Sequence, residues 1–119
     1  ALWLDDENLL HSVTALSGSG PAYFFLMLEA LESAATEAGI ESETARALAI
    51  QTMAGAAEMA ARSEDDPGQL KRNVMSPGGT TERAINTFEE GGLRDLVKKA
   101  YSAAFERSRE MSRELADKQ

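Results

Sequence analysis

Residues 21–28 read PAYFFLML, and from Ala22 to Leu28 they form two predicted helical turns that are apolar on every side. A surface helix needs only one apolar stripe, so a helix that is apolar all round is buried all round. A chain of 119 residues has little volume in which to cover such a helix. We therefore expect it to pack against a second copy, because two-fold dimers are the commonest assembly. The alternative is a monomeric bundle that covers this helix within one chain.

The whole sequence predicts an all-α fold, a helical bundle of about six helices. The chain is rich in alanine and poor in proline, and alanine loses no side-chain entropy in a helix. Apart from an apolar stub at Leu2–Leu4, no segment alternates with the period of two that marks a strand. The predicted helices cover residues 7–16, 21–38, 42–62, 68–75, 80–90 and 93–117.

Start and stop signals separate these helices. The segment Ser17–Pro21 breaks the first helix, and Pro21 suits the first turn of the second. Gly39 is the natural residue after the second helix, and Gly91–Gly92 ends the fifth. The N-caps are expected at Asp5 or Asp6, at Ser42, and at Thr80 or Thr81.

The third predicted helix also favours self-association. Small residues give it a thin surface that a second helix can approach closely. These residues are Ala45, Ala47, Ala49, Ala54, Gly55, Ala56, Ala57, Ala60 and Ala61.

Composition and charge exclude several classes of function. The formal net charge of −8 repels phosphate backbones and anionic membranes, so we expect no nucleic-acid and no membrane partner. The chain has no cysteine and a single histidine, His11, so we expect no metal site and no histidine-based triad. No apolar run is long enough to span a membrane and no signal peptide is visible, so the expected location is cytoplasmic. The chain begins without methionine on an apolar stub, and we expect residues 1–119 to be one domain cut from a longer protein.

The most informative segment chemically is SPGGTT at residues 76–81, between two predicted helices. Adjacent glycines permit positive φ angles and a close approach of a ligand to the backbone. The following helix start offers free N–H groups and a partial positive charge, which together suit a carboxylate or a phosphate. The alternatives are a threonine-capped turn without a ligand and a helix-turn-helix DNA reader, which the acidic charge disfavours.

Other polar residues have mainly structural interpretations. We expect Tyr23 and Tyr101 to pack with tethered hydroxyl groups, and His11 to lie on the surface or at an interface of the first helix. Glu29 and Glu32 are either paired carboxylates or parts of one solvated helix face.

Four blocks in order resemble pyrroline-5-carboxylate reductase, in its C-terminal helical domain. They are TALSGSGPAY at 14–23, PGQLK at 67–71, SPGGTT at 76–81 and EGGLR at 90–94. The resemblance covers nearly the whole chain and implies a dimerisation and substrate-binding domain that interlocks with a second copy. It implies a homodimer, often within a larger ring such as a decamer. An N-terminal Rossmann domain, absent from this chain, would bind NADPH or NADH.

The resemblance also implies an activity and residue roles. The reaction would be hydride transfer to the C=N carbon of Δ1-pyrroline-5-carboxylate, which gives proline. Backbone N–H groups around Gly79, Thr80 and Thr81 would hold the substrate carboxylate, and the Thr81 hydroxyl would orient the imine or relay its proton. The remaining implied contacts are Ser76, Gly78 and Glu64 to the substrate, and Asn73 and Ser76 to the cofactor.

Two residues depart from the family pattern. Met75 stands where a small residue is usual, and Thr80 where alanine is also common. Met75 would narrow or reshape the pocket wall. Because no GxGxxG segment is present, we predict that this chain alone catalyses no reduction. The alternative function is a helical oligomerisation module that binds no small molecule.

Overall fold

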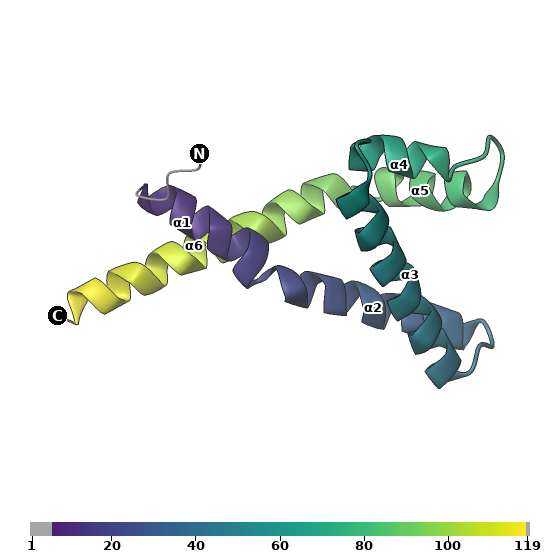
Figure 1. Cartoon of the computed structure of the whole chain (residues 1–119). Coiled ribbons are helices and arrows are strands. Elements are labelled where there is room, and N and C mark those ends of the chain that lie inside the picture. Colours follow the sequence, from purple (N-terminus) through teal and green to yellow (C-terminus); the bar gives the residue numbers. More distant parts are fainter. Residues whose placement is uncertain (1–5, 119) are drawn as a thin grey trace. The chain divides into compact units, whose positions relative to one another are not determined.

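The computed structural model describes residues 6–118, and this part of the chain contains helices and no strand (Figure 1). The all-α prediction is therefore confirmed, while the predicted stub at Leu2–Leu4 lies outside the described residues. The elements are α1 (Glu7–Val13), the π-helix η1 (Thr14–Gly18), α2 (Gly20–Glu37), α3 (Ser42–Arg62), α4 (Pro67–Asn73), α5 (Thr80–Glu90) and α6 (Leu93–Asp117).

The chain divides into two compact units. The first consists of the described parts of 1–24 and 92–119, and the second of residues 25–91. The chain passes from the first unit to the second within α2, and it returns to the first unit at Gly91–Gly92. Gly92 has a φ of 81°, a left-handed conformation that glycine adopts without steric penalty, so the prediction of a helix end at Gly91–Gly92 is confirmed.

In the first unit, α1 packs against α6 through polar side chains as well as apolar ones. The Nδ1 atom of His11 lies 2.7 Å from the Ser108 Oγ. Its ring meets Phe105 edge-on, with ring centroids 6.0 Å apart. His11 is only 8% exposed, so of the two expected positions, surface or interface, the surface one was wrong. A polar ring is tolerated here because Ser108 satisfies one of its nitrogen atoms.

The two tyrosines are tethered as predicted. The Tyr101 hydroxyl donates to the Ser12 backbone oxygen at 2.9 Å and also contacts the Ser12 hydroxyl. The Tyr23 hydroxyl donates to the backbone oxygen of Ala15 at 2.5 Å. Ala15 is fully buried. Because both tyrosine hydroxyl groups bind backbone oxygen atoms, they hold the α1–η1 region in place.

The predicted break at Ser17–Pro21 was largely wrong, because the π-helix η1 runs through Gly18 and α2 already begins at Gly20. The first helix ends at Val13 rather than Leu16, and η1 follows at once. The Ser17 hydroxyl donates to the Val13 oxygen at 3.0 Å, and the Ser19 N–H reaches back five residues to the Thr14 oxygen at 2.8 Å. Side-chain donors of this kind compete for the carbonyl groups of the regular ladder, which favours the wider turn.

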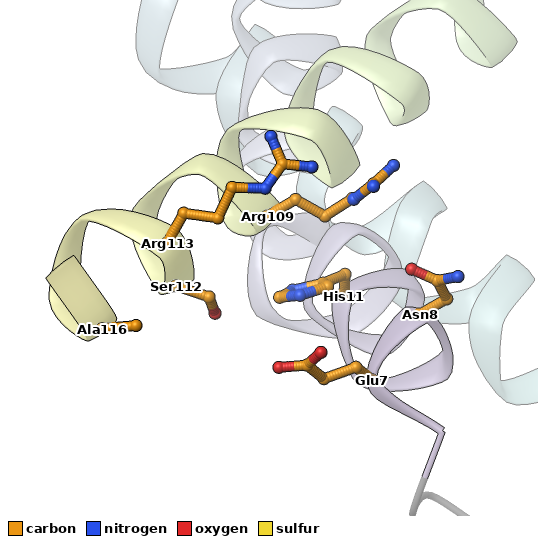
Figure 2. Close-up of a pocket in the computed structure, with 7 residues that line it drawn as sticks. All are labelled: Glu7, Asn8, His11, Arg109, Ser112, Arg113 and Ala116. Atoms are coloured by element: carbon orange, nitrogen blue, oxygen red, sulfur yellow. The ribbon is translucent and has the colours of Figure 1, made fainter.

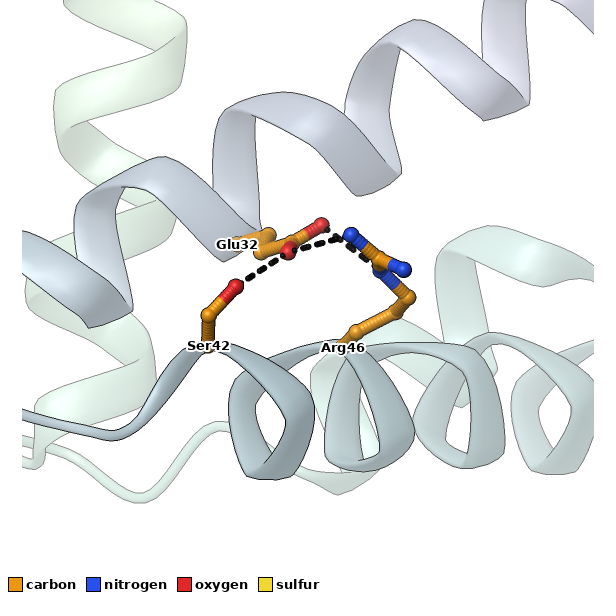
Figure 3. A network of polar contacts seen from close by, with 3 residues as sticks. All are labelled: Glu32, Ser42 and Arg46. Carbon is orange, nitrogen blue, oxygen red and sulfur yellow. Dashed lines mark hydrogen bonds and ion pairs between the residues drawn. The ribbon is translucent and has the colours of Figure 1, made fainter.

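In the second unit, a tight turn joins α2 to α3. Gly39 has a φ of 108°, its N–H donates to Thr36, and the Ile40 N–H donates to Ala35. These two bonds make the Schellman motif, which confirms Gly39 as the residue that ends α2. Across the turn, Glu32 accepts hydrogen bonds from Ser42 and Arg46, as Figure 3 shows.

Two further predicted helices need correction at their ends, and one predicted cap is confirmed. Ser42 is the first residue of α3 rather than its cap, because its hydroxyl donates to Glu32 and Glu41 takes the N-cap position. Helix α4 spans Pro67–Asn73 instead of 68–75, with Asp66 as its N-cap. The side chain of Asp6 accepts from the Asn8 N–H at 2.8 Å, so Asp6 caps α1 as predicted, whereas Asp5 lies outside the described residues.

Much apolar surface is left open in a single chain. Ala15 and Ala45 are the buried apolar residues among those described. In contrast, Phe24, Phe25 and Leu26 are 59%, 64% and 66% exposed. The all-round apolar stretch of α2 is therefore not covered within one chain. The solvent-accessible surface area of the single chain is 9502 Å². A typical folded monomer of 12.8 kDa exposes roughly 6,300 Å².

Candidate functional site

The connection between α4 and α5 forms a tight loop whose two glycines have different roles. Gly78 has a φ of 74°, in the left-handed region, whereas Gly79 is extended with a φ of −86° and a ψ of 179°. The Gly79 N–H donates to the Ser76 oxygen at 2.9 Å. A Cβ atom on Gly79 would lie 3.1 Å from that same oxygen. Gly78 is thus favoured by its backbone angle, and Gly79 by the closeness of Ser76.

The predicted threonine cap of α5 was wrong. Gly79 occupies the N-cap position and Thr80 is the first helical residue, with no side-chain hydrogen bond at the cap. Instead, the Glu82 Oε1 accepts from the Gly78 N–H at 3.0 Å. A glutamate three residues after the N-cap is a known sequence signal, and it was overlooked because the cap was assigned to a threonine.

The first turn of α5 leaves donors available. In the described part of the chain, the N–H groups of Thr80, Thr81 and Glu82 have no backbone acceptor, because the first carbonyl used by α5 is that of Gly79, which accepts from Arg83. Thr80 is exposed, while Thr81 is half-buried. These free N–H groups and the positive end of the helix dipole favour an anion at this position.

Most of the predicted site residues are close along one connection. Asn73 ends α4, Ser76, Gly78 and Gly79 form the loop, and Thr80 and Thr81 begin α5. The Asn73 side-chain oxygen accepts from the Gln69 side chain at 2.7 Å, which fixes the orientation of its amide. All of these residues belong to the second unit.

Glu64 is the one predicted site residue that the loop does not include. It is exposed and lies in the bend between α3 and α4, at the opposite end of α4 from the loop. A seven-residue helix such as α4 is about 10 Å long. Among the described residues, Glu64 has no hydrogen bond or ion pair with the loop.

A hollow of about 190 Å³ lies elsewhere, between α1 and α6 in the first unit (Figure 2). It contains none of the predicted site residues. Its lining residues are Glu7, Asn8, His11, Arg109, Ser112, Arg113 and Ala116. We give the α4–α5 loop more weight than this hollow, because the loop combines free backbone donors with a helix N-terminus. Within residues 6–118, no three acidic or histidine side chains are grouped to hold a metal ion, and no helix is long and apolar enough to cross a membrane.

The comparison with protein families identifies the chain. The family model described as pyrroline-5-carboxylate reductase dimerisation matches residues 7–111. The chain belongs to this family. The sequence resemblance is therefore confirmed, and the matched segment includes both the η1 region and the α4–α5 loop.

Relatives and solved structures of the reductase family agree with this assignment. Pyrroline-5-carboxylate reductase from Pseudomonas aeruginosa is 51% identical over 115 residues, which is 97% of this chain and 42% of that protein. The enzyme from Pisum sativum is 47% identical over 111 residues, 93% of this chain and 41% of that protein. The chain thus spans about two fifths of the length of these curated relatives.

The fold is similar to the corresponding part of two solved reductases. A pyrroline-5-carboxylate reductase structure from Coxiella burnetii matches with a TM-score of 0.87 and 50% identity, over 92% of this chain and 40% of that chain. A crystal structure of the Plasmodium falciparum enzyme with NADP bound matches with a TM-score of 0.85 and 37% identity, over 89% of this chain and 40% of that chain.

Proposed function

We propose that residues 1–119 are the dimerisation and substrate-binding domain of a reductase that converts Δ1-pyrroline-5-carboxylate to proline with NADPH or NADH. The proposal rests on the α4–α5 loop, where the N–H groups of Thr80 and Thr81 have no acceptor in the hydrogen-bond ladder of α5. The substrate carries a carboxylate, and backbone N–H groups at a helix start bind this group well. Family membership supplies the reaction, and the cytoplasm is its proposed location.

The residues of the loop have different proposed roles in substrate binding. The Thr80 and Thr81 N–H groups hold the substrate carboxylate. Gly78 lets the substrate approach the backbone, since open space lies where its Cβ atom would be, while Gly79 lets Ser76 close the loop beside the substrate. Their own N–H groups are used within the structure, by Glu82 and Ser76. Ser76 contributes an exposed hydroxyl beside the carboxylate, and Glu64 is proposed at the edge of the pocket.

Thr81 is the proposed catalytic residue. Its own N–H is one of the two proposed to bind the carboxylate, so its hydroxyl is proposed to lie beside the ring nitrogen of a substrate held there. During reduction a hydride adds to the C=N carbon and the nitrogen retains or takes up one proton. A threonine hydroxyl is a weak acid, so the role of Thr81 is to orient the imine by a hydrogen bond.

Asn73 and Ser76 are proposed to contact the cofactor. Both side chains are exposed and neutral, and each offers a donor and an acceptor, which suits the carboxamide of a nicotinamide ring. The bound cofactor supplies the hydride. The residues of this chain position the substrate for that transfer, and a separate Rossmann domain would hold most of the cofactor.

Self-association is part of the same proposal. The apolar side chains of Phe24, Phe25 and Leu26 are more than half exposed in one chain. Large exposed apolar side chains gathered on one helix favour an interface, and the family is named for dimerisation. We propose an interlocked homodimer, with further assembly into a decamer.

The activity is tested with the complete polypeptide that contains this chain. Oxidation of NADPH is followed with Δ1-pyrroline-5-carboxylate, and turnover with formation of proline is expected. Residues 1–119 alone are expected to give none. A complete polypeptide that self-associates but neither turns over nor binds L-proline would support the oligomerisation module instead.

Light scattering on a dilution series of residues 1–119 tests the self-association. A dimer or larger assembly is expected at micromolar concentration. Phe25→Asp should dissociate it, because a charge in an apolar interface must be desolvated. Ser33→Asp on the same helix is the matched control, since Ser33 is exposed and polar. A folded monomer in the unsubstituted chain would contradict the proposed dimer.

A further inference from the structure

We infer that Glu82 is a positioning residue that holds the α4–α5 loop ready for the substrate and, by its charge, weakens carboxylate binding there. The inference rests on the proposed function. It follows from the hydrogen bond between the Glu82 Oε1 and the Gly78 N–H, at 3.0 Å.

This hydrogen bond fixes Gly78, the residue of the loop that loses most conformational freedom when the loop becomes ordered. Gly78 has a φ of 74°, and glycine loses more conformational freedom on ordering than any other residue. The Gly79 N–H is already bonded to Ser76, so the loop is fixed at two successive N–H groups by two different acceptors. The acceptor of the first is a side chain on α5 itself. Glu82 therefore ties the loop to the helix whose N-terminus binds the substrate.

The arrangement also keeps donors free for a ligand. In a capping box, a glutamate at this position accepts from the N–H of the N-cap residue. Here that N–H belongs to Gly79 and donates to Ser76, and Glu82 reaches one residue further back. Among the described residues, the N–H groups of Thr80 and Thr81 keep no backbone acceptor. The carboxylate of Glu82 thus orders the loop without occupying these two donors.

The charge of Glu82 has the opposite effect on binding. Its carboxylate is half-buried and lies at the same helix start that attracts the substrate carboxylate. Two like charges at one site repel, and the repulsion is only partly screened by water. Glu82 therefore helps binding through its hydrogen bond and opposes it through its charge, and two substitutions can separate these effects.

Glu82→Gln keeps an oxygen acceptor and removes the charge. In the complete polypeptide, its KM for Δ1-pyrroline-5-carboxylate should fall about two- to fivefold, the size of a weak charge interaction near the surface. Glu82→Ala removes both the acceptor and the charge. Because loss of the hydrogen bond outweighs the relief of repulsion, its KM should rise about three- to tenfold. The KM for NADPH should stay constant in both.

Glu90→Gln is the matched control. Glu90 is an exposed glutamate at the other end of α5, eight residues from Glu82. That spacing corresponds to about 12 Å along the helix, beyond the screening length of roughly 8 Å at physiological salt. Its KM should match that of the unsubstituted protein. Circular dichroism of every variant checks that the helices remain folded.

Amide hydrogen exchange supplies a readout that does not depend on turnover. The Gly78 N–H should be protected in the unsubstituted chain, remain protected in Glu82→Gln and exchange faster in Glu82→Ala. Equal exchange in all three, or a KM that shifts in the same direction in both variants, would overturn the role of Glu82. Absence of turnover in the unsubstituted protein would instead overturn the proposed function, and this inference with it.

Discussion

The hydroxyl of Tyr101 on α6 donates a hydrogen bond to the backbone oxygen of Ser12, 89 residues earlier in the chain, at 2.9 Å. This bond, together with the contact to the Ser12 hydroxyl, joins the two ends of the sequence within one unit. It fixes the backbone at the end of α1, where the chain is about to enter the π-helix.

Tyr101→Phe should lower the free energy of unfolding by about 1–2 kcal/mol, because the Ser12 oxygen loses a partly buried donor while the ring remains. Chemical denaturation at one fixed protein concentration measures this effect. Ser102→Ala, at an exposed position next to Tyr101 on α6, should leave the denaturation midpoint unchanged. Equal midpoints for Tyr101→Phe and the unsubstituted chain would show that the tether contributes nothing.

Several helix ends were predictable because they are set by residues with local chemistry. Gly39, Pro67 and Gly91–Gly92 act through their own backbone preferences, so their roles can be read without knowledge of the fold. The start of α6 at Leu93, directly after Gly92, was predicted correctly for the same reason. A helix followed by two glycines, or begun by a proline, has few other solutions.

The errors arose where a side chain had more than one possible partner. Ser42 has the hydroxyl of a good cap, but Glu32 lies across the α2–α3 turn and accepts the hydrogen bond from this hydroxyl instead. His11 shows no local signal of burial, because the residues that cover it, Phe105 and Ser108, are more than ninety positions away. Such choices depend on contacts between distant segments, which a local pattern does not contain.

Only part of the candidate site was predictable from the sequence. SPGGTT gives the free N–H groups of Thr80 and Thr81, because any helix start has them. The sequence does not reveal which glycine needs the left-handed angle, nor that Glu82 bonds to Gly78. Both features depend on the residue at which α5 begins, so a shift of the N-cap by one residue changes both of them.

Gly39→Ala should lower the free energy of unfolding by about 1–2 kcal/mol. The φ of 108° at Gly39 is unfavourable for a residue with a Cβ atom, although no neighbouring atom lies within 4 Å of the added group. Gly39→Asn should lose less, because asparagine tolerates positive φ angles better than alanine. Thermal unfolding of both variants compares them, and an equal loss would point to a cause other than backbone strain.

The ion pair of Glu32 should make a small contribution to stability that depends on pH. Hydrogen bonds from Arg46 and then Ser42 lower the pKa of the Glu32 carboxyl below its ordinary value of 4.5. A carboxyl with a lowered pKa in the folded state stabilises the fold above the unfolded pKa, and this contribution is lost as the pH falls through the folded value. The contribution should be complete well above pH 4.5 and should decline as the pH falls below that value.

Glu32→Gln isolates this effect. The variant should unfold at a slightly lower denaturant concentration than the unsubstituted chain at pH 7, and the difference should shrink as the pH falls below 4.5. High salt should also reduce it at pH 7, because Arg46 is largely exposed and its charge is screened. A difference that stays constant from pH 7 to pH 3 would argue against the ion pair as its source.

Gly79→Val tests the substrate loop by crowding it rather than by straining its backbone. Valine readily adopts the extended angles of Gly79, but its Cβ atom would lie 3.1 Å from the Ser76 oxygen. That oxygen accepts the Gly79 N–H, so it must move and shift the loop around Thr80. A displacement of this kind should raise the KM for Δ1-pyrroline-5-carboxylate roughly ten- to hundredfold in the complete polypeptide.

Gly78→Ala is the contrasting variant, because the added methyl group at Gly78 meets open space and only the φ of 74° opposes it. It should lower the free energy of unfolding by about 1–2 kcal/mol. Light scattering should show the same assembly for Gly79→Val as for the unsubstituted protein, since the crowding is confined to Ser76. If Gly79→Val instead breaks the assembly and leaves the KM unchanged, the loop serves self-association and the substrate carboxylate binds elsewhere.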